Sequence, residues 1–400
     1  MGKIYNLVKV ILSNLVVTCK SDSMLQHVKI LDLSRLLPGP YCSMILADLG
    51  CDIIKIEEPT TGDYTRWMPP FINGESARFL SVNRNKRSMT LNLKTEKGRE
   101  IFFKLVQKSD VVLESFRPGT LQKLQVDYER AQEVNPQIIY CSITAYGQNG
   151  PYKSKAAHDI NILGLGGVLS ITKDRTIPGI QIADTTSGLL ACIAILTALI
   201  TREKTKKGQY IDISMLDGVI SLLSVHAAEY FATNVSPVPE KMPLSGGLAC
   251  YHVYETKDSK FITLGALEPK FWNLLCKTIE REDLIPEQLR EDQKSLKKVL
   301  KDIFKQKDQK EWVNILTDMC TPVNSLEEVF QDPQVLHRDM LSFVDHPAAG
   351  TINQIGIPIK GLDTTKMRPP PLFGEHTRAI LTNLGFLETE IEEFKELGVI

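Results

Sequence analysis

The stretch VKILDLSRLLPGPYCSMILADLGCDIIKI, residues 28–56, contains the pattern that decides the fold. Residues 28–33 form a short apolar run typical of a buried strand, and the turn Leu37-Pro38-Gly39-Pro40 follows it. A helix is predicted over residues 41–49, ended by Gly50, and a second strand over residues 52–56. Strand, helix and strand in this order form a βαβ unit, so we predict a parallel sheet.

The same alternation continues along the chain to about residue 144. Further strands are predicted over residues 89–93, 111–116 and 138–144, with helices over 97–108 and 128–135 between them. A long apolar helix is expected over residues 189–200, and a hairpin over 251–255 and 260–265 interrupts the parallel pattern. We therefore expect an α/β protein with a large parallel-sheet domain and a smaller α+β domain.

Composition shifts suggest where these domains end. We predict a large domain over residues 24–233, a linker over 234–245 that contains three prolines, a small domain over 246–340 and a C-terminal segment over 341–400. Residues 1–23 are interpreted as an N-terminal extension, because Met24 directly precedes the first strand and is a possible start of the chain. The apolar residues of this extension are interrupted by polar ones, so neither a signal peptide nor a membrane-spanning helix is predicted.

The overall composition is that of a soluble enzyme-sized protein. Of the 400 residues 24% are charged, yet the net charge is only -1, which favours neither nucleic acid nor an acidic membrane surface as a partner. The eight cysteines form no CxxC motif and none pairs with histidine at metal-binding spacing. We expect a cytoplasmic protein without a metal site or a stable membrane association.

Two acid/base groups flank a glycine-studded apolar segment in the middle of the chain. His158 and Asp159 precede this segment, and Asp184 follows it, before the long apolar helix. Such a pair of separated groups is suited to proton transfer. Asp184 also stands where a helix-capping residue would, and His158 fits a hydrogen-bonded, partly buried histidine equally well. The local pattern leaves both interpretations open.

Basic residues fall at or beside several predicted strand ends. Lys55, Arg84, Lys86 and Arg117 have this placement. If those ends share one edge of the parallel sheet, a cationic edge suits a ligand that carries phosphate. The alternative is that they are ordinary surface charges.

An ordered set of motifs resembles the family III CoA-transferases, a group that contains formyl-CoA, carnitine and bile-acid CoA-transferases and the α-methylacyl-CoA racemases. The resemblance covers about residues 28–380. The motifs that carry it are Leu37–Pro40, Ala47–Gly50, Ile54–Glu57, Asn83–Lys86, Phe116–Gly119, Gly147–Pro151, Lys207–Gln209 with Ile211-Asp212, and Arg368–Gly374. The resemblance implies an interlocked homodimer and a Rossmann-like large domain completed by the C-terminal segment. It also implies that CoA lies along the strand ends, where Lys55, Arg84 and Arg117 match groove positions.

The resemblance also implies roles for the central acid/base groups. In the racemases an aspartate at the position of Asp184 and a histidine exchange protons with the α-carbon, and a glutamate supports the histidine. Here the corresponding segments are Ala157-His158-Asp159-Ile160-Asn161 and Gly265-Ala266-Leu267-Glu268-Pro269, with alanine in place of the expected glycine before the histidine. The resemblance thus favours a 2-methylacyl-CoA racemase in which His158, Asp184 and Glu268 are catalytic and Asp159 orders the histidine loop.

Two alternatives remain open. A CoA-transferase would use Asp184 as the nucleophile that forms an acyl intermediate, and a non-catalytic CoA-binding relative would use none of these groups. The segment from Asp184 to Gly188 contains fewer glycines than the racemase pattern. In either enzyme CoA enters as part of the acyl-CoA substrate, and no further cofactor is expected.

Overall fold

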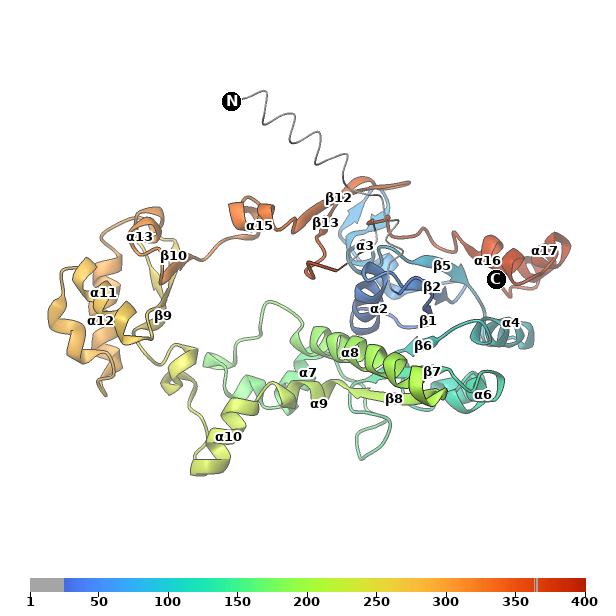
Figure 1. Cartoon of the computed structure of the whole chain (residues 1–400), viewed down its shortest axis with the longest axis horizontal. Helices are drawn as coiled ribbons and strands as arrows, with labels where there is room; N and C mark the ends of the chain where they lie inside the picture. Colours follow the sequence, from blue (N-terminus) through green and yellow to red (C-terminus); the bar gives the residue numbers. More distant parts are fainter. Residues whose placement is uncertain (1–24, 363, 365) are drawn as a thin grey trace, which may run out of the picture. The chain divides into compact units, whose positions relative to one another are not determined.

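The computed structural model describes residues 25–362, 364 and 366–400 (Figure 1). The predicted N-terminal extension and Met24 lie outside the described residues. The chain forms two compact units. Unit 1 comprises the described residues through Ala157 together with Ala183–Gly218 and Met340–Ile400, and unit 2 comprises His158–Ile182 and Val219–Asp339. The domain bounds drawn from the sequence stay a prediction.

Unit 1 is built on a six-stranded sheet in which every neighbouring pair of strands is parallel. The strands, in their order across the sheet, are β5 (Arg87–Thr90), β2 (Asp52–Glu57), β1 (Lys29–Asp32), β6 (Val111–Glu114), β7 (Ile139–Thr144) and β8 (Gln209–Ser214). In chain order this is 3-2-1-4-5-6, the arrangement of the doubly wound nucleotide-binding fold. The predicted α/β class with a parallel sheet is confirmed.

Helices cover both faces of this sheet. The helices of unit 1 are α2 (Pro38–Asp48), α3 (Ala77–Val82), α4 (Glu96–Val106), α5 (Thr120–Leu124), α6 (Tyr128–Val134), α8 (Ile182–Thr205), the first residues of α9 (Met215–Ser221), α16 (Thr377–Asn383) and α17 (Glu388–Glu396). On one face, Leu31, Val112 and Tyr140 of the strands join Phe102 of α4 and Phe394 of α17 in one buried apolar cluster. Helix α2 packs against β1, β2 and β6 on the other face. Burial on both faces explains why the strands read as nearly continuous apolar runs.

The C-terminal segment returns to this sheet. The antiparallel hairpin β12 (Leu341–His346) and β13 (Gly350–Ile355) places Val344 and Ile352 against Leu80 of α3. Farther on, the backbone amide of Asn92 donates to the carbonyl of Val399 at 2.8 Å. Helices α16 and α17 therefore complete the core of unit 1. A small two-stranded sheet, β3 (Phe71–Ile72) with β4 (Glu75–Ser76), lies between β2 and α3 in the chain.

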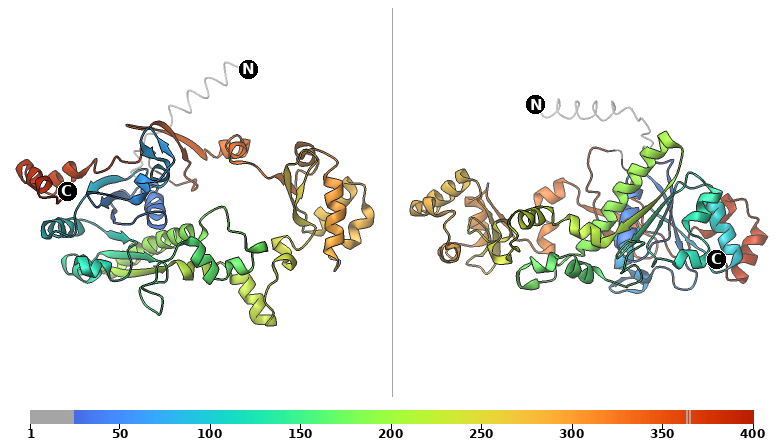
Figure 2. Two further views of the ribbon diagram at one scale, coloured as in Figure 1. Left: turned by 180° about the vertical axis from the view of Figure 1, so that it is seen from behind. Right: turned by 90° about the horizontal axis from the view of Figure 1, so that it is seen from below.

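Unit 2 contains a three-stranded antiparallel sheet and short helices (Figure 2). The strands are β9 (Tyr251–Glu255), β10 (Phe261–Gly265) and β11 (Cys320–Pro322), and the helices are α7 (Asp159–Leu165), α10 (Ser224–Thr233), α11 (Pro269–Thr278), α12 (Gln293–Phe304), α13 (Gln309–Ile315), α14 (Leu326–Val329) and α15 (Pro333–His337). Trp272 is fully buried among these elements, and its indole N–H donates to the carbonyl of Leu284 at 3.0 Å.

Candidate active site

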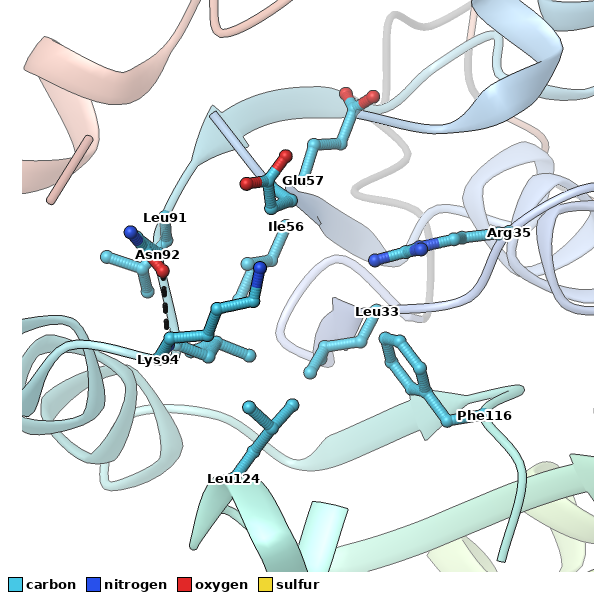
Figure 3. A pocket seen from close by; sticks show the side chains of 11 residues that line it. Leu33, Arg35, Ile56, Glu57, Leu91, Asn92, Lys94, Phe116 and Leu124 are labelled. Atoms are coloured by element: carbon cyan, nitrogen blue, oxygen red, sulfur yellow. Dashed lines mark hydrogen bonds between the residues drawn. The ribbon is translucent and has the colours of Figure 1, made fainter. Parts of the chain in front are cut away.

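An open crevice lies at the carboxyl edge of the unit 1 sheet (Figure 3). Its walls come from residues at or just beyond the ends of four adjacent strands, β5, β2, β1 and β6. The chain winds outward in opposite directions from β1 and β6, so this is the topological switch point of the sheet. Ligands of doubly wound folds bind at such a point. The fold itself therefore marks this crevice as the candidate binding site.

The crevice combines apolar walls with two cationic side chains, Arg35 and Lys94, and two carboxylates, Glu57 and Glu58. Its apolar surface comes from Leu33, Ile56, Leu91, Phe116 and Leu124. In Figure 3 the Arg35 side chain reaches in from one side and the Lys94 side chain from another. The Arg35 guanidinium lies 5.0 Å from the centre of the Phe116 ring and 5.1 Å from that of Tyr64. An apolar slot with an aromatic wall and cations suits a planar heterocycle that carries phosphate.

Sequence reasoning missed these crevice residues. Arg35 follows the predicted strand over residues 28–33, whereas Leu91 and Phe116 lie within the strands predicted over 89–93 and 111–116 and just beyond the ends of β5 and β6. The rule that ligands bind beyond the carboxyl ends of parallel strands could have singled them out. The basic residues predicted at strand ends were instead Lys55, Arg84, Lys86 and Arg117.

Lys55, Arg84 and Lys86 are buried in ion pairs. Their side chains are 1%, 2% and 0% exposed, and their nearest carboxylate partners are Asp63 at 2.9 Å, Asp48 at 2.7 Å and Asp32 at 3.3 Å. None of these cations lines the crevice. The ion pairs give the three side chains a structural role in this structure, and their contact with CoA phosphates stays a prediction.

The Lys86 side chain connects the residue before β5 to the end of β1 and to the start of α2. The Lys86 ammonium donates to the carbonyl of Pro40 at 3.0 Å and to Asn83 Oδ1 at 2.8 Å. Burial lowers the pKa of Lys86 to about 8, although the Asp32 carboxylate opposes the shift. Burial also acts against the charge of Asp32, but Lys86, Lys55 and two serine hydroxyl groups outweigh it and hold the pKa of that carboxyl below its ordinary value. This network fixes the N-terminus of α2 beside the end of β1.

Arg117 differs from the other three predicted cations because its side chain is exposed. It lies three residues beyond the end of β6 and lines a second, smaller pocket together with Glu114, Ser142 and Tyr210. Phe116, its neighbour in the chain, lines the crevice. Arg117 is therefore the predicted phosphate contact that lies at the carboxyl edge with its side chain accessible.

Asp184 lies in the first turn of α8, because this helix begins at Ile182, earlier than the sequence predicted. A Cβ atom added at Gly188 would lie 2.7 Å from the Pro38 carbonyl oxygen, so α8 approaches the N-terminus of α2 closely. Helix α2 starts just after β1, at the carboxyl edge of the sheet. Asp184, one turn before Gly188, is thereby placed at the edge that holds the crevice.

His158, Asp159 and Glu268 belong to unit 2. His158 immediately precedes α7, is exposed, and donates its backbone N–H to Asn161 Oδ1 at 2.9 Å. Asp159 is in the first turn of α7, and Glu268 is the exposed N-cap residue of α11. Within the described part of unit 2, no hydrogen bond or ion pair joins the His158 and Glu268 side chains. The predicted catalytic residues are therefore divided between the units, with Asp184 in unit 1 and the other three in unit 2.

Comparisons with known proteins agree with this fold. The model of the CoA-transferase family III matches residues 25–377. Succinyl-CoA:glutarate CoA-transferase of Mus musculus is 36% identical over 400 residues, which cover 96% of this chain and 91% of that protein. α-Methylacyl-CoA racemase of Homo sapiens is 34% identical over 395 residues, which cover 94% and 97%.

A solved structure extends the comparison to three dimensions. The crystal structure of a CAIB/BAIF family protein from Brucella suis matches with a TM-score of 0.81 at 33% identity, covering 91% of this chain and 100% of that one. The family match spans both units, and the resemblance first recognised in the motifs is confirmed. The chain belongs to CoA-transferase family III, whose members are enzymes that act on CoA thioesters.

Proposed function

We propose that this protein is an acyl-CoA racemase that inverts the α-carbon of 2-methylacyl-CoA thioesters. The observation that supports a CoA-thioester enzyme best is the position of Asp184, at the same sheet edge as a crevice suited to a nucleotide. Asp184 alone serves either of two chemistries. His158 and Glu268 favour racemisation, because they supply the second acid/base group and its supporting carboxylate.

The proposed chemistry is proton transfer on two faces of one carbon. The thioester acidifies its α-carbon, so a base of moderate strength can remove the proton and leave an enolate. One of Asp184 and His158 removes the proton, and the other returns one to the opposite face. With substrate bound, Glu268 accepts a hydrogen bond from the imidazole and fixes its tautomer. The positive end of the α8 dipole favours the enolate oxygen.

Solvent exchange tests this proposal. Purified protein is incubated with (R)-2-methylacyl-CoA in deuterated buffer without an acceptor acid, and deuteration and chirality of the α-carbon are followed. Wild type should exchange and racemise, whereas Asp184→Asn and His158→Ala should lose roughly 100-fold or more of the racemisation rate. Asp174→Asn and His337→Ala make the same changes at exposed residues and should leave the rate unaltered. Absence of exchange in the wild type would count against racemisation.

A second candidate is CoA transfer between carboxylic acids. It is favoured by the relatives named succinyl-CoA:glutarate CoA-transferase, which are 36% identical to this chain. Here the Asp184 carboxylate attacks the thioester carbonyl, the C–S bond breaks, and CoA leaves as a thiolate. Hydroxylamine would then trap an adduct on Asp184, and activity would need an acceptor acid with ping-pong kinetics. Exchange without an acceptor and no adduct would exclude this candidate.

We also propose that a second copy of the chain covers the outer face of α8. Leu189, Ile193 and Ile200 are 46%, 60% and 67% exposed and lie along one side of that helix. By length and composition α8 could also cross a membrane. It connects β7 to β8 in the parallel sheet, however, and 44% of its most apolar 18-residue stretch is buried. For an interlocked homodimer we expect a solution mass of twice 44.9 kDa. Light scattering that gives the mass of one chain would contradict it.

A further inference from the structure

Three polar residues form a row across the carboxyl end of the sheet. Glu114 at the end of β6 pairs in register with Ser142 of β7, which pairs with Asp212 of β8. Paired residues of neighbouring strands point to the same face of a sheet. Glu114 and Ser142 are 4% and 1% exposed. The hydroxyl of Tyr210 donates to Ser142 Oγ at 2.9 Å, and Ser142 in turn bonds to the Glu114 carboxyl group.

Glu114 also holds the segment that leaves β6. Its Oε2 atom accepts the backbone N–H of Phe116 at 2.6 Å. Phe116 forms part of the crevice wall, and Arg117 lines the adjoining smaller pocket with Glu114 itself. The Arg35 guanidinium also lies over the face of the Phe116 ring. The Glu114 carboxyl group is thus connected to an aromatic wall and a cation of the crevice through one short hydrogen bond.

The surroundings of Glu114 allow both of its charge states near neutral pH. Burial raises its pKa to about 7, and the Asp212 carboxylate adds to this effect, whereas the hydrogen bonds from Ser142 and Phe116 oppose it. No ion pair reaches Glu114 among the described residues. The titratable and charged groups that face it are Asp212 and Tyr210 of β8, Tyr140 and Cys141 of β7, Asp127 and Tyr128 at the start of α6, and Arg117.

We propose that Glu114 is a positioning residue of the crevice, and that its ionised form holds Phe116 in the arrangement that binds the nucleotide of coenzyme A. A charged acceptor makes a stronger hydrogen bond to an amide than a neutral one. Protonation of Glu114 leaves the weaker bond and loosens the wall. Affinity for coenzyme A therefore falls as Glu114 takes up a proton. The inference rests on the proposed function only in taking coenzyme A as the ligand.

Direct binding of free coenzyme A tests this role without any turnover. Dissociation constants are measured by calorimetry between pH 6 and pH 8.5 for wild type, Glu114→Gln and Glu133→Gln, the last an exposed carboxylate on α6. The phosphates of coenzyme A also titrate in this range, but they do so equally for all three proteins. The informative quantity is therefore the ratio of variant to wild-type dissociation constants at each pH.

The glutamine variant keeps an acceptor oxygen and lacks the charge, so it should behave as wild type does at low pH. The ratio for Glu114→Gln should be near one at pH 6 and about fivefold at pH 8.5. For Glu133→Gln it should stay near one throughout. A constant ratio, or one that falls below one at high pH, would overturn the proposed role. Absence of coenzyme A binding by the wild type would instead overturn the proposed function.

A second variant keeps the test decisive if Glu114→Gln does not fold. Tyr210→Phe removes the hydroxyl that polarises Ser142. The Ser142 bond to ionised Glu114 then weakens, so the pH at which affinity is half lost should move upward relative to wild type. An unchanged binding curve in Tyr210→Phe would contradict the chain of hydrogen bonds on which the inference depends.

Discussion

Glu114 makes the stability of the protein depend on pH. Its pKa is raised from 4.5 to about 7, so the native state binds the proton more tightly than the unfolded chain. The stabilisation is complete below about pH 4.5 and is lost as the pH rises through 7, by about 3 kcal/mol. Glu114→Gln should lack this loss. Chemical denaturation gives the difference in free energy of unfolding between Glu114→Gln and wild type at each pH. This difference should favour the variant more at pH 8 than at pH 5. An equal difference at both pH values would contradict the assignment.

The buried ion pair of Arg84 and Asp48 makes a second prediction at the scale of one residue. Asp48→Ala leaves a guanidinium that is 2% exposed without its carboxylate. Removing one partner of a buried pair costs about 3–5 kcal/mol, because the remaining charge is uncompensated. The Arg87–Asp52 pair is the matched control, since its side chains are 25% and 31% exposed. Asp52→Ala should cost about 1 kcal/mol or less in the free energy of unfolding.

The buried ion pairs and the crevice residues were only partly predictable from the sequence. The cations at Lys55, Arg84 and Lys86 were visible, but their partners Asp63, Asp48 and Asp32 lie elsewhere in the chain and carry no local signal. Pairing depends on which side of the sheet each residue faces, and the strand pattern did not settle this because both faces are buried. A strand-end rule, by contrast, does point to Phe116 and Arg35.

At the scale of elements, the close approach of α8 to α2 depends on Gly188. An added Cβ would meet the Pro38 carbonyl oxygen at 2.7 Å and the Tyr41 ring at 3.2 Å. Gly188→Ala should therefore shift the first turns of α8, with a cost of about 1–3 kcal/mol and a loss of activity through displacement of Asp184. Gly164→Ala is the control, because its nearest neighbour would be 3.9 Å away. Melting temperature and exchange rate measured on both variants check this; equal effects would contradict the tight contact.

The βα alternation and the β9–β10 hairpin were predictable because period and turn residues are local signals. The residues at which helices begin and end were less predictable. Helix α8 begins at Ile182 instead of residue 189, since polar residues of its first turns are tolerated at a helix N-terminus. Helix α7 was missed: its glycines hide the helical period, and its formation relies on Asn161 bonding back to the His158 amide.

At the scale of the molecule, the C-terminal segment contributes to the core of unit 1, and this return was expected from the family resemblance and not from local pattern. Phe394 of α17 is 3% exposed and packs edge-on against Phe386 with ring centres 5.2 Å apart. Ile391 and Val399 join the same cluster as Phe102 and Leu91 near the start of the chain. Contacts between segments far apart in the chain leave no periodic trace in the sequence, so local pattern does not predict them.

This return makes the stability of the crevice depend on the last residues of the chain. Phe394→Ala removes a ring from a core that also holds Leu91, a crevice residue. The free energy of unfolding should fall by about 3–5 kcal/mol. Leu397→Ala, only three residues away but 64% exposed, should leave it nearly unchanged. If the two variants unfold at the same denaturant concentration, the C-terminal helix is not part of the cooperative core. If Phe394→Ala alone is destabilised and also binds coenzyme A less tightly, the segment supports the crevice from behind.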